Sequence, residues 1–213
     1  MKIILIAPSG GGKSTVSEFI IRDFGVSHIS TGDIFRRNIA DGTPLGEQVE
    51  KYIKKGLFVP DEIVLEMVGE RIVQSDCQNG FILDGFPRTL NQAQLFAEKV
   101  DIDAVIELDV SDEIVMYRLT GRWMCRKCGT IHNSNRESIE HCKLCDSVQL
   151  YQRDDDKEDI IKNRLAQYRE VRDDLLNFYR STGKLFTVSV DKDTSPEEVY
   201  QTVKTFLDEK GIK

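Results

Sequence analysis

Residue types that bind phosphate chains come together in the segment APSGGGKS, residues 7–14. A phosphate-binding loop requires G-x-x-x-x-G-K-[ST] between a strand and a helix, and this segment matches except that Ala7 replaces the first glycine. Backbone N–H groups of such a loop point at phosphate oxygens, Lys13 adds a positive charge, and the Ser14 hydroxyl is suited to Mg²⁺. Ala7 adds only one methyl group, so we expect the loop to form. The alternative is a glycine-rich turn without a ligand.

Two more polar segments follow predicted strands. HISTGDIFRR follows the second strand and ILDGFPRTLNQAQ follows the third. Taken alone, an aspartate at a strand end or an arginine after a proline is often a surface residue. Together with the phosphate loop, the two segments place a pair of carboxylates near the metal, Asp33 and Asp84, and direct a pair of guanidinium groups at a second anion, Arg36 and Arg88.

Four of the five cysteines form two C-x-x-C pairs, Cys125 with Cys128 and Cys142 with Cys145. This spacing indicates a structural Zn²⁺ bound by four thiolates rather than disulfides. Cys77 is left over and is expected to have no special role. A zinc ribbon that contacts nucleic acid is the competing interpretation, but interleaved aromatic residues are missing around Trp123.

Composition excludes several classes of protein. The 213 residues suffice for one globular unit, and the net charge of −7 disfavours binding to nucleic acid or to an anionic membrane. No apolar run approaches the roughly 18 residues that span a bilayer. The apolar start, residues 1–8, continues directly into the phosphate loop, so we interpret it as a buried strand rather than a signal peptide, and we expect a cytoplasmic protein.

Short apolar runs alternate with longer helical patterns, which is typical of a parallel sheet wrapped by helices. Strands are predicted at 2–6, 26–29, 80–83, 104–108 and 185–190. Helices are predicted at 14–22, 61–75, 90–100, 111–120, 157–180 and 196–209. Two segments interrupt the alternation: residues 31–59 carry helical pieces without a strand, and residues 121–156 carry cysteines and polar turns. Both are expected over the carboxyl edge of the sheet, where ligands bind in open α/β folds.

The motifs in their order resemble adenylate kinases of the bacterial type with a long, zinc-containing lid. The resemblance covers nearly the whole chain and rests on STGDIFR, DGFPRTLNQA, TGR, the paired cysteines, QRDDD and NRLAQYR. It implies an α/β fold with a five-stranded parallel sheet of the P-loop kinase type. It also implies reversible phosphoryl transfer from Mg·ATP to AMP, giving two ADP, by a protein that is by default a monomer. The implied parts are a core (1–29, 60–120 and 157–213), an AMP-binding segment (30–59) and a lid (121–156).

The resemblance also assigns roles to residues. AMP would be bound by Thr31, Arg36, Leu57, Val59, Gly85, Arg88, Gln92, Arg153 and Arg164. ATP would be bound by Gly10, Gly11, Gly12, Lys13, Ser14, Thr15, Arg118, Arg122, Ile131 and His132. The catalytic charges would come from Lys13, Arg88, Arg122, Arg153 and Arg164, without a general base, and Mg²⁺ would be held through water or hydroxyl by Ser14, Asp33 and Asp84. Asp155 and Asp156 would position the lid or brace its arginines, unless they form a solvated acidic turn.

The chain departs from the family pattern at a few positions. Ser14 and Lys192 stand where glycine is usual, and His132-Asn133 stands where Tyr-His is usual. Two other functions remain open at this point. One is a UMP/CMP kinase. Thr31 and Gln92 disfavour it because they fit the adenylate-specific pattern. The other is a catalytically silent, zinc-dependent nucleotide-binding protein. The complete set of catalytic charges disfavours this alternative.

Overall fold

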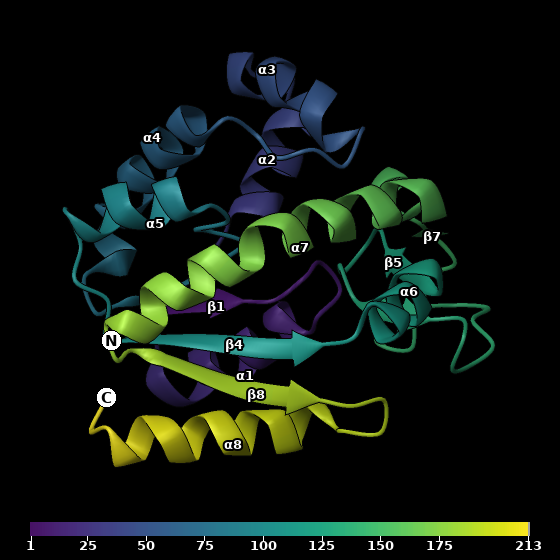
Figure 1. Ribbon diagram of the computed structural model, residues 1–213. Helices are drawn as coiled ribbons and strands as arrows, with labels where there is room; N and C mark the ends of the chain where they lie inside the picture. The colour runs from purple at the N-terminus through teal and green to yellow at the C-terminus, as the bar shows by residue number, and fades with distance from the viewer. Residues whose placement is uncertain (213) are drawn as a thin grey trace.

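The computed structural model, which describes residues 1–212, is built on a five-stranded parallel sheet (Figure 1). The strand order is β2-β3-β1-β4-β8. The strands are β1 (Lys2–Ile6), β2 (Ser27–Ser30), β3 (Phe81–Asp84), β4 (Ala104–Val110) and β8 (Leu185–Val190). The five predicted strands are therefore all present, with boundaries that differ by no more than two residues.

Both faces of the sheet are buried, which explains the nearly continuous apolar runs. In β1, Ile3 and Leu5 belong to one hydrophobic core, and Ile4 and Ile6 belong to the other. This alternation follows from the two-residue period of a strand. The phosphate loop leaves β1 from the middle of the sheet, so it starts from a rigid position.

Helices cover both faces. On one face lie α1 (Lys13–Phe24) and α8 (Pro196–Glu209), and the long α7 (Glu158–Ser181) crosses the other face, as Figure 1 shows. The remaining core helices are α4 (Asp61–Ile72), α5 (Leu90–Ala97) and α6 (Asp112–Thr120), with a 3-10 turn at Ser75–Cys77. Capping serines and threonines start several of them, including Thr89 at α5 and Ser111 at α6, because their oxygens accept a free N–H of the first turn.

Two segments are inserted between these elements. Residues 31–59 form α2 (Thr31–Ala40) and α3 (Pro44–Ile53), in line with the predicted helical pieces. Residues 121–156 contain more structure than the predicted polar turns: β5 (Arg122–Cys125), β6 (Ile131–Asn133) and β7 (Leu150–Tyr151) form an antiparallel sheet, followed by a 3-10 turn at Asp154–Asp156. Strands this short have no readable two-residue period, so the sequence pattern did not reveal them.

Both insertions begin on the carboxyl side of a core strand: α2 follows β2 directly, and the small sheet follows β4 and α6. In Figure 1, β4 points toward α6 and the small sheet, while the two chain termini lie at the opposite end. Loops at that edge are therefore in position to form a ligand site. No helix within residues 1–212 combines the length and the apolar composition needed to cross a membrane.

Candidate active site

The phosphate loop connects β1 directly to α1. The ammonium group of Lys13 donates to the carbonyl oxygens of Ala7, at 3.0 Å, and Pro8, at 3.1 Å, so it folds back over the loop. Because α1 begins at Lys13, the free N–H groups of its first turn lie at the same place. The loop thus combines a helix N-terminus with a cation, which is the arrangement that binds phosphates.

Ala7 fits because of Gly11. A Cβ at position 11 would lie 2.8 Å from the Cβ of Ala7 and 2.9 Å from the carbonyl oxygen of Pro8, both closer than side chains approach. Glycine leaves that space free, and the backbone N–H of Gly11 donates to Pro8 at 3.0 Å. The loop therefore forms with Ala7 in place, as expected, because Gly11 leaves room for the Ala7 methyl group.

Asp84 links the loop to the neighbouring strand β3. Its carboxylate accepts a hydrogen bond from the Ser14 hydroxyl at 3.0 Å and lies 3.8 Å from the Lys13 ammonium and 3.5 Å from His28 Nε2. Burial alone would raise the pKa of Asp84, but the charge of Lys13, together with His28 and Ser14, lowers it to about 2. The carboxylate is therefore ionised at neutral pH, beside a hydroxyl.

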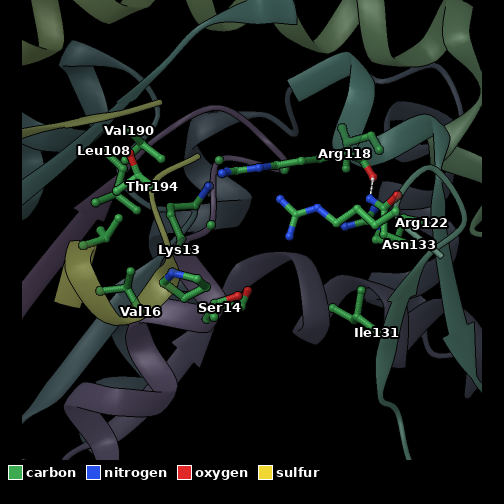
Figure 2. Close-up of a pocket in the computed structure, with 18 of the residues that line it drawn as sticks. Lys13, Ser14, Val16, Leu108, Arg118, Arg122, Ile131, Asn133, Val190 and Thr194 are labelled. Carbon is green, nitrogen blue, oxygen red and sulfur yellow. Dashed lines mark hydrogen bonds between the residues drawn. The ribbon is translucent and has the colours of Figure 1, made fainter. Parts of the chain in front are cut away.

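A cavity of about 470 Å³ opens between the phosphate loop and the small sheet. Figure 2 shows Arg118 and Arg122 extending into it toward Lys13. Its walls include every residue that the sequence assigned to ATP: Gly10, Gly11, Gly12, Lys13, Ser14, Thr15, Arg118, Arg122, Ile131 and His132. Apolar residues from β4, β8 and α8, such as Leu108, Val190 and Val199, close its other side. We call this space the donor cavity.

A second cavity, of about 50 Å³, lies between α2 and the loop after β3. Its walls include Thr31, Arg36, Leu57, Val59, Gly85, Arg88, Gln92 and Arg164, which are eight of the nine residues that the sequence assigned to AMP. Gly85 has a φ of +84°, and a Cβ there would lie 2.8 Å from the Thr31 hydroxyl, so only glycine allows these walls to meet. We call this space the acceptor cavity.

A small third cavity, of about 40 Å³, shares walls with the other two. Lys13 lines it together with the donor cavity, and Arg88 and Arg164 line it together with the acceptor cavity. Burial, followed by repulsion from Arg164, lowers the pKa of Arg88 to about 10, and burial lowers that of Lys13 to about 8. Positive charge is thus concentrated where the two cavities approach each other, and this arrangement suits a group that carries several negative charges.

Two buried ion pairs fix the end of the inserted segment 121–156: one joins it to the start of its own small sheet, and the other joins it to α7 of the core. Asp156 accepts from the Arg122 guanidinium at 2.5 and 2.8 Å, and Asp155 accepts from Arg164 at 2.7 Å. Both aspartates are less than a tenth exposed. A solvated acidic turn does not describe them, because each one orients an arginine at a cavity wall.

Comparison with known proteins identifies the family. The family model for adenylate kinase matches residues 5–184. The chain is 41% identical over its full length to the whole adenylate kinase of Caldicellulosiruptor saccharolyticus. It is also 43% identical to that of Limosilactobacillus fermentum and 42% identical to that of Carboxydothermus hydrogenoformans, each over 97% of this chain and 99% of the relative.

The chain belongs to the adenylate kinase family. Members of this family are ATP:AMP phosphotransferases, so the expected family, fold class and enzyme class are confirmed.

Asp33 and Arg153 have predicted roles, but neither lines one of these cavities. Asp33 forms an ion pair with Arg36 at 2.5 Å, and its side chain is largely exposed. Within residues 1–212 no hydrogen bond or ion pair joins it to Ser14 or Asp84. Arg153 donates from Nε to the Met124 sulfur. Burial, with repulsion from Arg36 and Arg122, lowers the pKa of Arg153 to about 10, so it belongs to the same cationic cluster.

Other residues at the site escaped the sequence interpretation. His28 contacts Asp84, and Arg136 and Glu137 line the donor cavity together with Asn133. Asn133 donates to the carbonyl oxygen of Arg118 at 3.0 Å, the contact drawn in Figure 2, and so ties the small sheet to α6. His28 begins the segment HISTGDIFRR, and Asn133 is one of the departures from the family pattern. Nothing in the sequence indicated that these side chains reach the site, because they do so only through the fold.

The Sγ atoms of the four paired cysteines lie close together, as is required for a zinc site in the lid of an adenylate kinase. All four Sγ atoms lie within 4.8 Å of one another, with Cys125 and Cys145 at 3.6 Å and Cys128 and Cys142 at 3.4 Å. A tetrahedral ion with bonds of about 2.3 Å to sulfur separates its ligands by about 3.8 Å. The four thiols therefore fit Zn²⁺.

Proposed function

We propose that this chain transfers the terminal phosphoryl group of Mg·ATP reversibly to AMP, giving two ADP, with ATP in the donor cavity and AMP in the acceptor cavity. The single observation that carries this assignment is the wall of the small third cavity between them, where Lys13 of the donor cavity and Arg88 and Arg164 of the acceptor cavity concentrate positive charge. Two nucleotides bound on either side of this wall would place their phosphates toward each other. Such alignment is most of what phosphoryl transfer requires.

The donor nucleotide is bound at both ends. Backbone N–H groups of residues 10–15 and the Lys13 ammonium take the phosphates, and the apolar residues between β4 and α8 take the base. Arg118 and Arg122 extend into the cavity toward Lys13, where they would contact the phosphates. Lys192, which replaces the usual glycine, contacts α6: its ammonium group lies 5.4 Å from the centroid of the Tyr117 ring. This lysine therefore faces α6 as well as solvent.

The acceptor nucleotide is bound through its phosphate and its base. Arg36 and Arg88 provide guanidinium forks for the α-phosphate, while Thr31, Leu57 and Val59 surround the base. Gln92, on the far wall, presents an amide to its edge. An attacking α-phosphate oxygen is already negative, so no general base is required.

Charge neutralisation is the chemical task of the protein side chains. In the transition state the negative charge spreads over the transferred group and both bridging oxygens. Lys13, Arg88, Arg122, Arg153 and Arg164 stabilise that charge, and the ion pairs of Asp155 and Asp156 hold two of these arginines in position. Preorganised charges act strongly here because the site is largely shielded from water.

The residues at the phosphate loop fit Mg²⁺. The metal prefers oxygen ligands and usually keeps several waters, and Ser14 with the ionised Asp84 supplies a hydroxyl and a carboxylate side by side. Asp33 is a more distant candidate that acts through water. When bound, Mg²⁺ neutralises phosphate charge. Zn²⁺ on the four thiolates of the lid is closed to other ligands, and its role is structural.

We also propose how the parts of the molecule work together. Residues 30–59 and the lid, 121–156, close over AMP and ATP, while 1–29, 60–120 and 157–213 form the core that stays rigid. Closure excludes water, which otherwise competes for the phosphoryl group. The protein acts as a cytoplasmic monomer without nucleic-acid or membrane partners, in keeping with its net charge of −7.

A coupled assay tests the function. The purified protein is incubated with Mg²⁺, ATP and one of AMP, CMP, UMP or GMP, and ADP is measured. We expect rapid ADP formation with AMP, and a loss of about 10² to 10³ in turnover for Lys13→Ala with the fold retained. Lys162→Ala, an exposed lysine on α7, is the matched control and should be fully active. No ADP from AMP, or faster reaction with CMP or UMP, would overturn the proposal.

A further inference from the structure

The amide of Gln92 is fixed by two partners of opposite chemistry. Gln92 is only 1% exposed, yet it lines the acceptor cavity. Its Nε2 donates to Oδ1 of Asp61 at 2.7 Å, and its Oε1 accepts from the backbone N–H of Arg88 at 2.8 Å. Asp61 is the first residue of α4, 31 positions earlier in the chain.

These partners allow only one orientation of the amide. An ionised carboxylate accepts hydrogen bonds and donates none, so the group facing Asp61 must be the NH₂. A backbone N–H only donates, so the group facing Arg88 must be the oxygen. A rotation of the amide by 180° would set oxygen against oxygen on one side and N–H against N–H on the other.

The free half of the amide then has a defined pattern. Nε2 keeps one N–H and Oε1 keeps one lone pair, side by side in one plane. Adenine presents an acceptor at N1 and a donor at its 6-amino group, which complements this pattern. Hypoxanthine and guanine present the reverse, a donor at N1 and an acceptor at O6, and would meet N–H with N–H and oxygen with oxygen.

We propose that Asp61 is a positioning residue that sets the base specificity of the acceptor site by locking the Gln92 amide in the orientation that accepts adenine and rejects 6-oxopurines. This inference rests on the proposed function, since it takes the acceptor cavity to hold the nucleoside monophosphate. Asp61 acts through Gln92 and does not itself line the cavity.

Asp61 is itself held in place, as a lock requires. Besides Gln92, its carboxylate accepts from the Thr89 hydroxyl at 2.9 Å and from Asn91 Nδ2 at 2.8 Å. Thr89 is also the residue that caps α5, the helix carrying Gln92, through a hydrogen bond from the Gln92 backbone N–H. The start of α4 and the start of α5 therefore hold the amide as one unit.

The wild-type protein provides the first test. AMP, IMP and purine riboside 5′-monophosphate are compared as acceptors at saturating Mg·ATP. Purine riboside monophosphate lacks the 6-amino group but keeps the N1 acceptor, so it should be used better than IMP, whose N1 carries a proton. IMP used as well as purine riboside monophosphate would overturn the inference, even if AMP is a good substrate.

The second test uses Asp61→Asn, whose amide can pair with either end of the Gln92 amide, so that only the backbone N–H of Arg88 still opposes the reversed orientation. We expect the ratio of kcat/KM for AMP to that for IMP to fall about tenfold or more, since a mismatched bidentate contact discriminates on that scale. The loss should appear in the acceptor KM, while the KM for ATP stays unchanged. Glu62→Gln is the matched control: it makes the same kind of change at the neighbouring, exposed carboxylate in the first turn of α4 and should keep the wild-type ratio.

The possible results distinguish a failure of the role assigned to Asp61 from a failure of the proposed function. A folded Asp61→Asn variant with the wild-type AMP to IMP ratio would overturn the role of Asp61 and leave the proposed function intact. Absence of AMP turnover in the wild-type protein would instead defeat the proposed function. If circular dichroism shows that Asp61→Asn does not fold, the wild-type comparison of purine riboside monophosphate with IMP decides the question.

Discussion

Lys13 and Arg88 show at the residue scale that this site is built for an anion. Burial is the largest influence on both side chains and lowers the pKa of each, to about 8 and about 10. A buried charge is costly to the folded state unless a partner compensates it. The arrangement therefore favours binding at the expense of stability, which is common for functional sites.

Replacing Arg88 by methionine separates these two effects. Methionine fills a similar space without a charge, so we expect Arg88→Met to keep or raise the melting temperature while kcat/KM for AMP falls about 10² to 10³-fold. Calorimetry and the coupled assay measure the two quantities. Arg180→Met, an exposed position on α7, is the control and should change neither. A marked fall in melting temperature for Arg88→Met would show that the charge stabilises the fold.

The pKa of Lys13 predicts a pH dependence. Lysine ordinarily has a pKa of 10.5, and burial brings that of Lys13 to about 8, so in the free protein its charge is complete at pH 6.5 and is lost as pH rises through 8. We expect kcat/KM for ATP to fall through that range, because this parameter reports the free enzyme. Lys13→Arg, which stays charged, should remove the fall near pH 8. An identical profile in that variant would exclude Lys13 as its source.

The same pKa shift fixes the sign of the effect on stability. Between pH 8 and 10.5 the unfolded chain keeps the Lys13 proton and the folded chain does not. The unfolded state then binds more protons, so the contribution of Lys13 to the free energy of unfolding rises with pH in this window.

At the scale of elements, the lid is a small sheet that depends on its attachments. Its strands have four, three and two residues, which is too little for an independent core. The segment 133–135 binds the carboxyl end of α6: Asn133 donates to Arg118, Ser134 donates through its backbone to Gly121, and Asn135 donates to Tyr117. The cysteine cluster joins β5 to the loop that carries Cys142 and Cys145.

Removal of the lid metal should affect stability more than chemistry. We expect about one equivalent of zinc per chain, and a fall in melting temperature of about 5 °C or more after chelation. At low temperature, turnover should change little, because the cluster does not touch the cavities. Cys142→Ser should behave like the chelated protein, whereas Cys77→Ser should bind zinc normally. A metal-free protein of unchanged stability would contradict the structural role.

At the scale of the whole molecule, α7 contacts both inserted segments. Gln167 on α7 donates to the carbonyl oxygen of Gly56 and accepts from the backbone N–H of Phe58. One turn earlier, Arg164 lines the acceptor cavity and pairs with Asp155 at the base of the lid. One rigid helix thus holds both insertions, so ligands at both sites should act on a common closed state.

This connection predicts how ligands stabilise the fold. A mimic that joins the two nucleotides through one phosphate chain should raise the melting temperature by more than ATP or AMP does at equal saturation. A ligand at about 100 times its Kd contributes about 2.7 kcal/mol, so a shift of several degrees is measurable by calorimetry. Arg164→Ala should reduce the advantage of the mimic over ATP. A mimic that stabilises no more than ATP would argue against the adjoining cavities.

The sequence by itself determined those features that depend on residues close together in the chain. The phosphate loop, the two C-x-x-C pairs and the buried strands are each formed by residues within a few positions, so their residue types and spacing reveal them. Most of the residues assigned to the two nucleotides line the two cavities, because the resemblance of the ordered motifs to a known family assigned them in groups.

The tertiary structure alone decided the contacts between distant segments. Asp61 meets Gln92 because the starts of α4 and α5 lie together, Asp155 and Asp156 are buried because arginines from other elements reach them, and Asp33 turns to Arg36 instead of the loop. Side-chain hydrogen bonds and ion pairs depend on distance in space, to within about an ångström, and no local pattern of residues records that distance.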